Sequence, residues 1–224
     1  ANPRQIAMDL ASLFALAWPM LLKGTGYTLL FAVASMIFGL PLAGLVTLIR
    51  VLQVWGLSSL MALYVSVIRG TPLLVQIFIF YYGLPSVGIE LSPITAGILT
   101  LTLNVAAYMS ETLRGSINAV TQGQWQAGTS LGLTRDQTLR YVVGPQALRA
   151  AVPSLSNSLI SLIKDTSLVS VIAVTELMLA TKELISTTFQ PFPLYLAAAA
   201  IYWVLSLSFE QIQRWMEKRV AYPY

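Results

Sequence analysis

Long apolar runs separated by short polar segments dominate the pattern of this chain. Five of these runs hold roughly 20 residues or more, which at about 1.5 Å per residue covers, or nearly covers, the hydrocarbon core of about 30 Å. The pattern predicts an all-α integral membrane protein with about five transmembrane helices, folded as a single domain over residues 1–224 with a core at 24–209 and a tail at 210–224. The expected spans are Gly24–Ile49, Leu57–Tyr82, Ile94–Leu113, Ala150–Val174 and Phe192–Phe209.

Basic residues are unevenly distributed between the predicted loops. An odd number of spans places the two ends of the chain on opposite sides, and the loops richer in Lys and Arg face the cytoplasm. The bias predicts an outer N-terminus and a cytoplasmic C-terminus. The inner side then holds Arg50, Arg114, Arg135, Arg140, Arg149, Arg214, Lys218 and Arg219, and the outer side holds Arg4, Lys23 and Lys182 with the acids Asp9, Glu90 and Glu183.

The first 22 residues differ from the predicted spans. Their apolar stretch Ala11–Leu22 is too short to cross and ends at Lys23. Apolar residues fall on one helical face, so we predict an extracytoplasmic amphipathic helix over residues 1–22 that lies on the membrane; a leftover signal-like segment is the alternative. The face consists of Ile6, Leu10, Leu13, Phe14 and Ala17, with Arg4 and Asp9 away from it.

Composition narrows the chemistry. The hydrophobic fraction is 56%, charged residues are 10%, and there is no Cys and no His. We therefore expect no disulfide, no thiol or imidazole nucleophile, no metal site and no catalytic residue. No Gly-Lys dipeptide occurs, so a Walker A phosphate loop cannot be built and this chain should bind no ATP by that route. The net charge of +4 reflects loop orientation, and no nucleic acid is expected as a partner.

A polar segment, Gly123–Pro145 (GQWQAGTSLGLTRDQTLRYVVGP), lies between the third and fourth spans. Trp125–Leu131 has a helical composition, and Gly132 can adopt the left-handed conformation that ends a helix. Thr134 and Gln137 then have the spacing of a capping box, which starts a second helix that runs to about Val143. Pro145 either ends this second helix or starts the next one. The segment predicts a stiff elbow of two short helices.

The spacing of this segment resembles the EAA loop of ATP-binding-cassette importer permeases. The resemblance rests on Gln126-Ala127-Gly128, Gly132, Val142 and Pro145, and it extends over roughly Gly24 to Phe209 through Arg69-Gly70-Thr71-Pro72-Leu73-Leu74, Ala107-Tyr108, Glu111 and Arg114-Gly115. The wider run looks like the polar amino-acid branch, and Tyr81–Pro85 with Gly88-Ile89 looks somewhat like its cystine permeases. The resemblance implies a type I importer permease fold in a bacterial cytoplasmic (inner) membrane.

In that family the loop is the socket of a separate ATPase subunit. The resemblance therefore implies docking residues at Gly123, Trp125, Gln126, Ala127, Gly128, Gly132 and Leu133. This chain departs from the family at Gln126, Gly128 and Gly144, where Glu, Ala and Leu are usual. Since Gln126 can hydrogen-bond but carries no charge, we expect a neutral docking contact at that position. A loop that merely joins two helices is the alternative.

Three charged residues fall in the middle of predicted spans. Arg69 lies in the second span beside Gly70 and Pro72, and Lys164-Asp165 lie in the fourth. A charge at the bilayer centre costs about 2.5–3.5 kcal/mol, so such residues face the bundle interior, find partners or line water. Polar breaks at mid-depth are typical of transporter binding sites. We expect a path for an amino-acid zwitterion, lined by Arg69, Thr71, Asn104, Asp165, Thr166 and Ser167.

The alternative is that the buried charges only pair. Arg69, Glu111, Lys164 and Asp165 sum to zero charge and could hold helices together. Glu111 is the weakest site candidate because Arg114, three residues away, suffices as a local partner. Asp165 and its neighbour Lys164 point about 100° apart on a helix, so Asp165 requires Arg69 across the bundle or the ammonium of a substrate.

The leading functional hypothesis, implied by the resemblance, is the permease subunit of an ATP-driven importer of polar amino acids that works by alternating access. Its partners would be a second permease in a homodimer or heterodimer, two ATPase subunits that hold ATP-Mg, an extracytoplasmic amino-acid-binding protein and the lipid bilayer. This chain itself would carry no cofactor and would not be an enzyme. The alternative is a passive channel or a regulatory or assembly subunit, which ATP-dependent uptake would distinguish.

Overall fold

The computed structural model describes residues 9–220, and every regular element in that range is helical. The elements follow one another with short connections. In chain order they are α1 (Leu10–Val51), α2 (Leu57–Gly70), α3 (Leu73–Phe78), the π-helical turn η2 (Ile79–Gly83), the 3-10 turn η3 (Leu84–Val87), α4 (Pro93–Ala119), α5 (Gln122–Ser130), α6 (Arg135–Thr138), the π-helical turn η4 (Leu139–Val143), α7 (Gly144–Asp165), the 3-10 segment η5 (Thr166–Ile172), α8 (Leu177–Thr188) and α9 (Pro191–Val220).

Helix α1 corrects the prediction for the N-terminal segment. It runs without a break for 42 residues, about 63 Å, and passes through Lys23 instead of ending there. Leu13, Ala17 and Leu21 are fully buried in a cluster with residues of α8 and α9. The described part of the segment therefore packs on protein in line with the first span, instead of forming a separate helix on the membrane; Arg4 and Ile6 lie outside the described residues.

Helices α1 and α4 form the centre of the bundle through close backbone approach. Gly39 of α1 faces Val105, and Gly97 of α4 faces Phe31; a Cβ atom on either glycine would lie 2.7 Å and 2.6 Å, respectively, from the facing side chain. Because residue numbers rise together along this contact, the two helices run parallel. Small residues that admit a neighbouring side chain in this way are the usual means of helix packing in lipid, where no hydrophobic force drives association.

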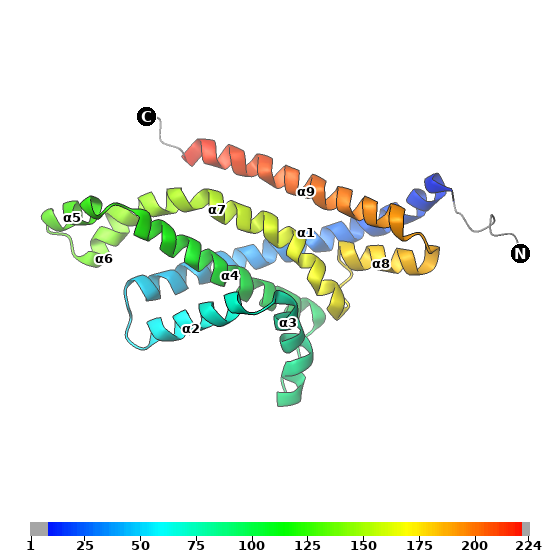
Figure 1. Ribbon diagram of the computed structural model, residues 1–224, viewed down its shortest axis with the longest axis horizontal. Helices are drawn as coiled ribbons and strands as arrows, with labels where there is room; N and C mark the ends of the chain where they lie inside the picture. Colours follow the sequence, from blue (N-terminus) through cyan, green and yellow to red (C-terminus); the bar gives the residue numbers. More distant parts are fainter. Residues whose placement is uncertain (1–8, 221–224) are drawn as a thin grey trace, which may run out of the picture.

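The second predicted span is sharply bent. Helix α2 ends at Gly70, Thr71 is extended, and the segment Leu73–Val87 leaves at 109° to α2. The residue before a proline avoids the helical region, and Pro72 has no N–H to continue the ladder, so the sequence dictates a break here. In Figure 1, α3 projects away from the bundle. The region predicted as one span, Leu57–Tyr82, therefore consists of helices on either side of a break at Pro72.

Length and apolarity identify three spanning helices in the described chain: α1, α4 and α9, or four spans if the bent α2–α3 pair is counted as one. The predicted fourth span, Ala150–Val174, is displaced. Its α-helix begins earlier, at Gly144, and ends at Asp165, where the tighter η5 follows. The predicted fifth span continues as α9 through Val220, so most of the predicted tail is helical.

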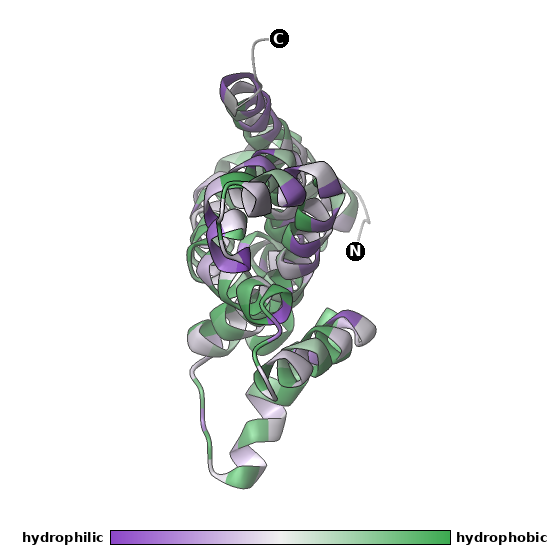
Figure 2. Cartoon of the chain, turned by 90° about the vertical axis from the view of Figure 1, so that its left-hand side faces the viewer, coloured by the Kyte–Doolittle hydropathy of each residue, from purple (hydrophilic) through white to green (hydrophobic). Residues whose placement is uncertain are grey.

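The two ends of the bundle differ in their elements. Figure 1 shows α5, α6 and the end of α9 at one end, and α8 and the start of α1 at the other. Seen from the α5–α6 end, hydrophilic residues mark the nearest ribbons, whereas α2 and α3 are mostly hydrophobic (Figure 2). The elbow and the last residues of α9 therefore share one end of the bundle, opposite the start of α1.

A buried carboxylate, Glu176, joins three helices at the end of the bundle that contains α8. Glu176, which is fully buried, caps α8 by accepting hydrogen bonds from the backbone N–H groups of Met178 and Leu179, both at 2.9 Å. It also accepts from the Tyr202 hydroxyl of α9 at 2.9 Å and from Thr28 of α1 at 3.4 Å. Because buried polar groups are stable only when hydrogen-bonded, this set fixes α1, α8 and α9 to one another.

The α1–α4 contact predicts that Gly97→Ala destabilises the protein. The added methyl would meet the ring of the fully buried Phe31, and overpacking of this kind costs about 1–3 kcal/mol. Gly26→Ala, in α1 with no atom within 4 Å of its new Cβ, is the matched control and should cost nothing. Thermal unfolding of both variants in detergent tests this; equal transition temperatures would contradict the packing argument.

Candidate functional site

A polar cavity of about 410 Å³ lies where the α2–α3 bend meets α4 and α7. The bend contributes extended backbone, α4 contributes an amide and a phenol, and α7 contributes a row of short polar side chains. The break at Pro72 opens this space, because a straight second span would carry its side chains past α4. The lining residues are Thr71, Pro72, Leu73, Asn104, Val105, Tyr108, Asn157, Ser158, Ser161, Asp165 and Leu168.

Helix α7 presents its polar side chains on one face. Asn157, Ser161 and Asp165 are four residues apart and therefore lie above one another along the helix. Asp165 is half-buried and forms no ion pair within 4 Å with any residue of the range 9–220, while its neighbour Lys164 is exposed. The cavity thus contains one carboxylate without a guanidinium or ammonium in contact.

Gln76 completes the bend that forms the cavity. Its side-chain amide donates to the carbonyl of Ile68 at 2.8 Å and to the carbonyl and hydroxyl of Thr71 at 3.1 and 2.9 Å. These groups lie at the end of α2, where the helix ladder is interrupted. The amide oxygen of Gln76 accepts from Asn104 of α4 at 3.0 Å. Gln76 therefore fixes the bend and also holds it against α4.

The structure brings together half of the predicted path residues. Thr71, Asn104 and Asp165 line the cavity as expected. Thr166 is fully buried and its hydroxyl donates to the carbonyl of Ile163 at 2.7 Å, and neither Thr166 nor Ser167 is among the lining residues. Arg69 also lies outside the lining. Sequence reasoning missed Gln76, Tyr108, Asn157, Ser158 and Ser161; the four-residue spacing up to Asp165 was the signal for Asn157 and Ser161.

Arg69 is directed to Glu111 rather than to Asp165. Its guanidinium lies 3.6 Å from Glu111 and stacks over the ring of Tyr108, 5.4 Å from the ring centre. Of the two partners expected for Asp165, Arg69 is therefore not in contact with it in this structure, and the substrate ammonium remains a prediction. Since Tyr108 also lines the cavity, its ring has the polar cavity as one neighbour and the Arg69 cation as another.

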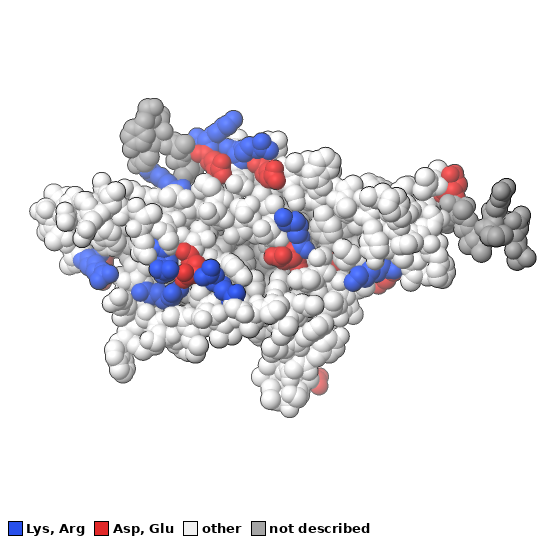
Figure 3. Space-filling model, in the orientation of Figure 1, with Lys and Arg blue, Asp and Glu red and all other residues white. Residues whose placement is uncertain are grey.

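Glu111 is the centre of a four-residue ion cluster that extends beyond its local pair with Arg114. Arg114 binds it at 2.9 and 3.2 Å, which confirms the local pair, but Arg50 from α1 and Arg69 from α2 bind it as well. The side chain of Glu111 is 18% exposed, so solvent screens these contacts only in part. Figure 3 shows how few charges the visible face carries and that they gather in small groups. One carboxylate thus joins three helices.

Glu111→Gln should loosen this part of the bundle. The variant keeps the side-chain shape but leaves three guanidiniums without their counter-charge, which we expect to cost about 2–3 kcal/mol, below the range for fully buried pairs. Glu210→Gln is the matched control, because the exposed Glu210–Arg214 pair at 3.7 Å contributes at most about 1 kcal/mol. Thermal unfolding in detergent measures both; equal small losses would refute the role of Glu111.

The segment Gly123–Pro145 folds as the predicted elbow. Helix α5 ends in a Schellman motif, with Gly132 at φ +77°, its N–H donating to Thr129 at 2.9 Å and that of Leu133 donating to Gly128 at 3.1 Å. The capping box also forms: Gln137 N–H donates to the Thr134 hydroxyl, and Thr134 N–H donates to the Gln137 side chain. These motifs fix the angle between α5 and α6.

Of the two roles expected for Pro145, the structure shows that it starts the next helix: it lies in the first turn of α7, after η4 ends at Val143. The π-helical turn η4 joins α6 to α7, and the chain stays helical through Gly144 and Pro145. A Cβ on Gly144 would lie 2.6 Å from the carbonyl oxygen of Leu139, so only glycine fits this turn without a shift. This contact is the physical reason why Gly144 stands where Leu is usual in the family. The turn at Gly144 makes the elbow continuous with α7.

The predicted docking residues divide into two groups. Gly123, Gln126 and Ala127 are exposed and available to a partner. Trp125 instead packs on an apolar cluster, and Gly128 is buried against Thr138 of α6. Gly132 and Leu133 form the turn. The apolar cluster under Trp125 comprises Ile117, Leu139, Val143 and Ala147, with Val51 and Val120 beside it.

Gly128→Ala should disturb the elbow. Its new methyl would lie 2.4 Å from the Thr138 side chain, where a second-site Thr138→Ala change removes the nearest atoms. We expect a loss of about 1–3 kcal/mol in the single variant and partial recovery in the double variant. Gly123→Ala, with open space around its Cβ, is the control. Thermal unfolding measures stability; a double variant no better than the single one would contradict the contact.

Comparison with known proteins identifies the architecture. Residues 39–222 match the family model of binding-protein-dependent transport system inner membrane components. The L-cystine transport system permease protein TcyB of Bacillus subtilis (strain 168) is 43% identical over 204 residues, 91% of this chain and 87% of TcyB. The glutamine transport system permease protein GlnP of Escherichia coli (strain K12) is 36% identical over 206 residues, 91% and 94% of the two chains. The chain belongs to this family.

Solved structures agree with this membership. A crystal structure of an amino acid ABC transporter with histidines superposes with a TM-score of 0.89 at 33% identity, over 95% of this chain and 99% of that one. The inward-facing MetNI methionine ABC transporter shares the fold, with a TM-score of 0.73 at 19% identity over 91% and 97% of the chains. The predicted type I importer permease fold is confirmed. The chain is a membrane transport component, and its family works with ATPase and binding-protein partners.

Proposed function

We propose that this permease subunit of an amino-acid ABC importer carries a polar amino acid through the cavity between the α2–α3 bend, α4 and α7. The carrying observation is Asp165: it is a half-buried carboxylate in a polar cavity, and it has no ion-pair partner among residues 9–220. The adjacent Lys164 attracts Asp165 only from beyond ion-pair distance, so a half-buried carboxylate here gains from a cation that binds it directly. The α-ammonium of an amino acid is such a cation.

The remaining lining groups suit the other parts of a zwitterion. Amide and hydroxyl groups of Asn104, Asn157, Ser158 and Ser161 can donate hydrogen bonds to a substrate carboxylate. Arg69 is held by Glu111 and Tyr108 beside the cavity, and its contact with Glu111 is the longest of the cluster at 3.6 Å. Arg69 therefore enters the path only if that contact opens during the transport cycle.

The elbow transmits the work of ATP hydrolysis. In this proposal the exposed residues Gly123, Gln126 and Ala127 contact an ATPase subunit, which binds ATP-Mg, while Trp125 and Gly128 hold the elbow on the bundle. Movement of the ATPase then moves α7, because η4 makes the elbow and α7 one continuous helical path. The bundle would alternate between outward and inward openings in this way.

The assembly and orientation follow the same reasoning. We propose two permease chains, as a homodimer or with a close relative, two ATPase subunits and an extracytoplasmic binding protein. The α5–α6 end, which also carries the basic last turn of α9 with Lys218 and Arg219, faces the cytoplasm, and the start of α1 faces outward. The naming of TcyB makes cystine the first substrate to test, with glutamine second because of GlnP.

Asp165→Asn tests the proposal. The change keeps the shape and removes the charge, so the assembled complex should form while uptake of radiolabelled cystine or glutamine into liposomes falls at least about tenfold, the effect of losing one charged hydrogen bond. Basal ATP hydrolysis should persist. Glu183→Gln, a half-buried acid outside the cavity, is the control.

Two results would count against the proposal. Normal uptake by Asp165→Asn would remove Asp165 from the path. Failure of the variant to assemble, measured by size in detergent, would assign Asp165 to helix association instead. Uptake that needs no ATP would favour the passive channel.

A further inference from the structure

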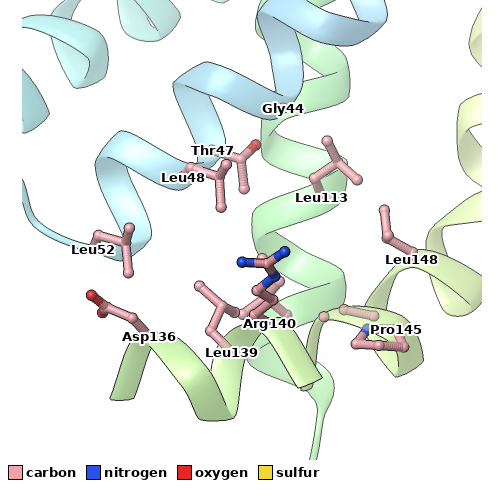
Figure 4. Close-up of a pocket in the computed structure, with 13 residues that line it drawn as sticks. Gly44, Thr47, Leu48, Leu52, Leu113, Asp136, Leu139, Arg140, Pro145 and Leu148 are labelled. Atoms are coloured by element: carbon pink, nitrogen blue, oxygen red, sulfur yellow. The ribbon is translucent and has the colours of Figure 1, made fainter. Parts of the chain in front are cut away.

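A second cavity, apolar and of about 470 Å³, lies at the α5–α6 end of the bundle. Figure 4 shows it between the last turns of α1, the end of α4 and the helical path that joins the elbow to α7. Its walls are almost entirely hydrocarbon. The lining residues are Gly44, Thr47, Leu48, Leu52, Leu113, Ile117, Asp136, Leu139, Arg140, Gly144, Pro145, Ala147 and Leu148.

The cavity is continuous with exposed apolar surface on the outside of the bundle. Leu48, Leu52 and Leu148 line it and are also 47%, 38% and 57% exposed, so their apolar surface continues from the cavity onto the outside of the bundle. Water gains nothing in such a space, because it offers too few polar partners. Hydrocarbon from the surrounding bilayer fits the surface chemistry, and the last turns of α1 and α4 put the cavity near the headgroup level.

The lining also includes one charge of each sign. Asp136 and Arg140 lie on the same helical path, yet they form no ion pair within 4 Å with each other or with another residue in the range 9–220. Figure 4 places Asp136 near Leu52 and the Arg140 guanidinium toward the centre of the cavity, apart from one another. Arg140 stacks on Tyr141, 5.4 Å from its ring centre, which leaves its N–H donors available.

We propose that this cavity binds a phospholipid with a phosphate and a primary ammonium in its headgroup, which is phosphatidylethanolamine. One acyl chain lies against Leu48, Leu113 and Leu148, and the phosphate accepts hydrogen bonds from Arg140. The ammonium donates to Asp136. Phosphatidylcholine cannot donate a hydrogen bond from its methylated nitrogen, and phosphatidylglycerol has no cation for Asp136. Asp136 and Arg140 together therefore favour phosphatidylethanolamine over the other two lipids.

A lipid bound in this cavity stabilises the contact between the elbow and the spanning helices. The lining of the cavity joins α1, α4, η4 and α7, so a bound lipid fills the space between the part that docks the ATPase and the part that lines the path. This inference does not depend on the substrate or on Asp165. Its failure would leave the proposed transport function untouched.

The experiment uses the importer purified with its ATPase subunits in mild detergent. Retained lipids are counted by native mass spectrometry, and thermal stabilisation is then titrated with phosphatidylethanolamine, phosphatidylcholine and phosphatidylglycerol. We expect wild type to retain and respond to phosphatidylethanolamine best. Arg140→Gln should weaken its apparent affinity about tenfold, since it removes a charged hydrogen bond. Asp136→Asn should remove the preference for phosphatidylethanolamine over phosphatidylcholine.

Steric filling tests the cavity itself. Leu148→Trp should abolish retention, whereas Leu45→Trp, an equally exposed leucine of α1 outside the lining, should not. Arg135→Gln also removes a positive charge from the elbow, but Arg135 does not line the cavity. It is therefore the control for Arg140→Gln and should leave lipid retention unchanged. Equal response of wild type to all three lipids, or retention unaffected by both Arg140→Gln and Leu148→Trp, would overturn the proposal. Loss of assembly with Leu148→Trp, with no lipid retained by wild type, would show that a protein subunit covers the cavity and would also overturn it.

Discussion

The contact of Glu111 with three arginines is the constraint on which the arrangement of α1, α2 and α4 depends. Helix association in lipid gains little from apolar burial, so packing contacts and polar contacts have to fix the relative positions of the spans. Close contacts such as Gly97 with Phe31 set the distance between α1 and α4. Glu111 adds α2, because it holds Arg50 from α1 and Arg69 from α2 at one point of α4.

Pro72 determines where the chain breaks, and the position of α2 determines where this break lies relative to α4. Arg69 is held by Glu111, and after the exposed residues Gly70 to Pro72 the side chain of Gln76 joins the bend to Asn104 of α4. Arg69 contacts this ion cluster and is not among the residues that line the polar cavity, and within the range 9–220 Asp165 forms no ion pair within 4 Å, although the adjacent Lys164 acts on it electrostatically. In this structure the pairing hypothesis therefore holds for Arg69 and Glu111, while Asp165 remains open to the proposed role in the substrate path.

The features that the sequence predicted best are local ones. The Schellman glycine Gly132 and the capping box of Thr134 and Gln137 depend on residues within one or two turns, so spacing alone identifies them. Pro72 predicted a break for the same reason, but not its angle of 109°, which depends on tertiary contacts of α3. The pairing alternative included Arg69 and Glu111 but could not say which of its four charges meet, and the continuity of α1 through Lys23 was missed, because both depend on helices far apart in the sequence.

Helix α7 links the two proposed sites mechanically. Its first residue follows η4 directly, so the elbow has no flexible joint with it, and its last residue is Asp165. Over 22 residues, about 33 Å, a helix transmits a tilt with little bending, although Pro153 lies inside it. Because the other walls of the cavity belong to α4 and to the bend held by Gln76, a tilt of α7 moves Asp165 relative to Asn104 and Thr71. An ATPase that displaces the elbow would therefore change the width of the cavity at the carboxylate itself, which is the geometric requirement for coupling hydrolysis to release of the substrate.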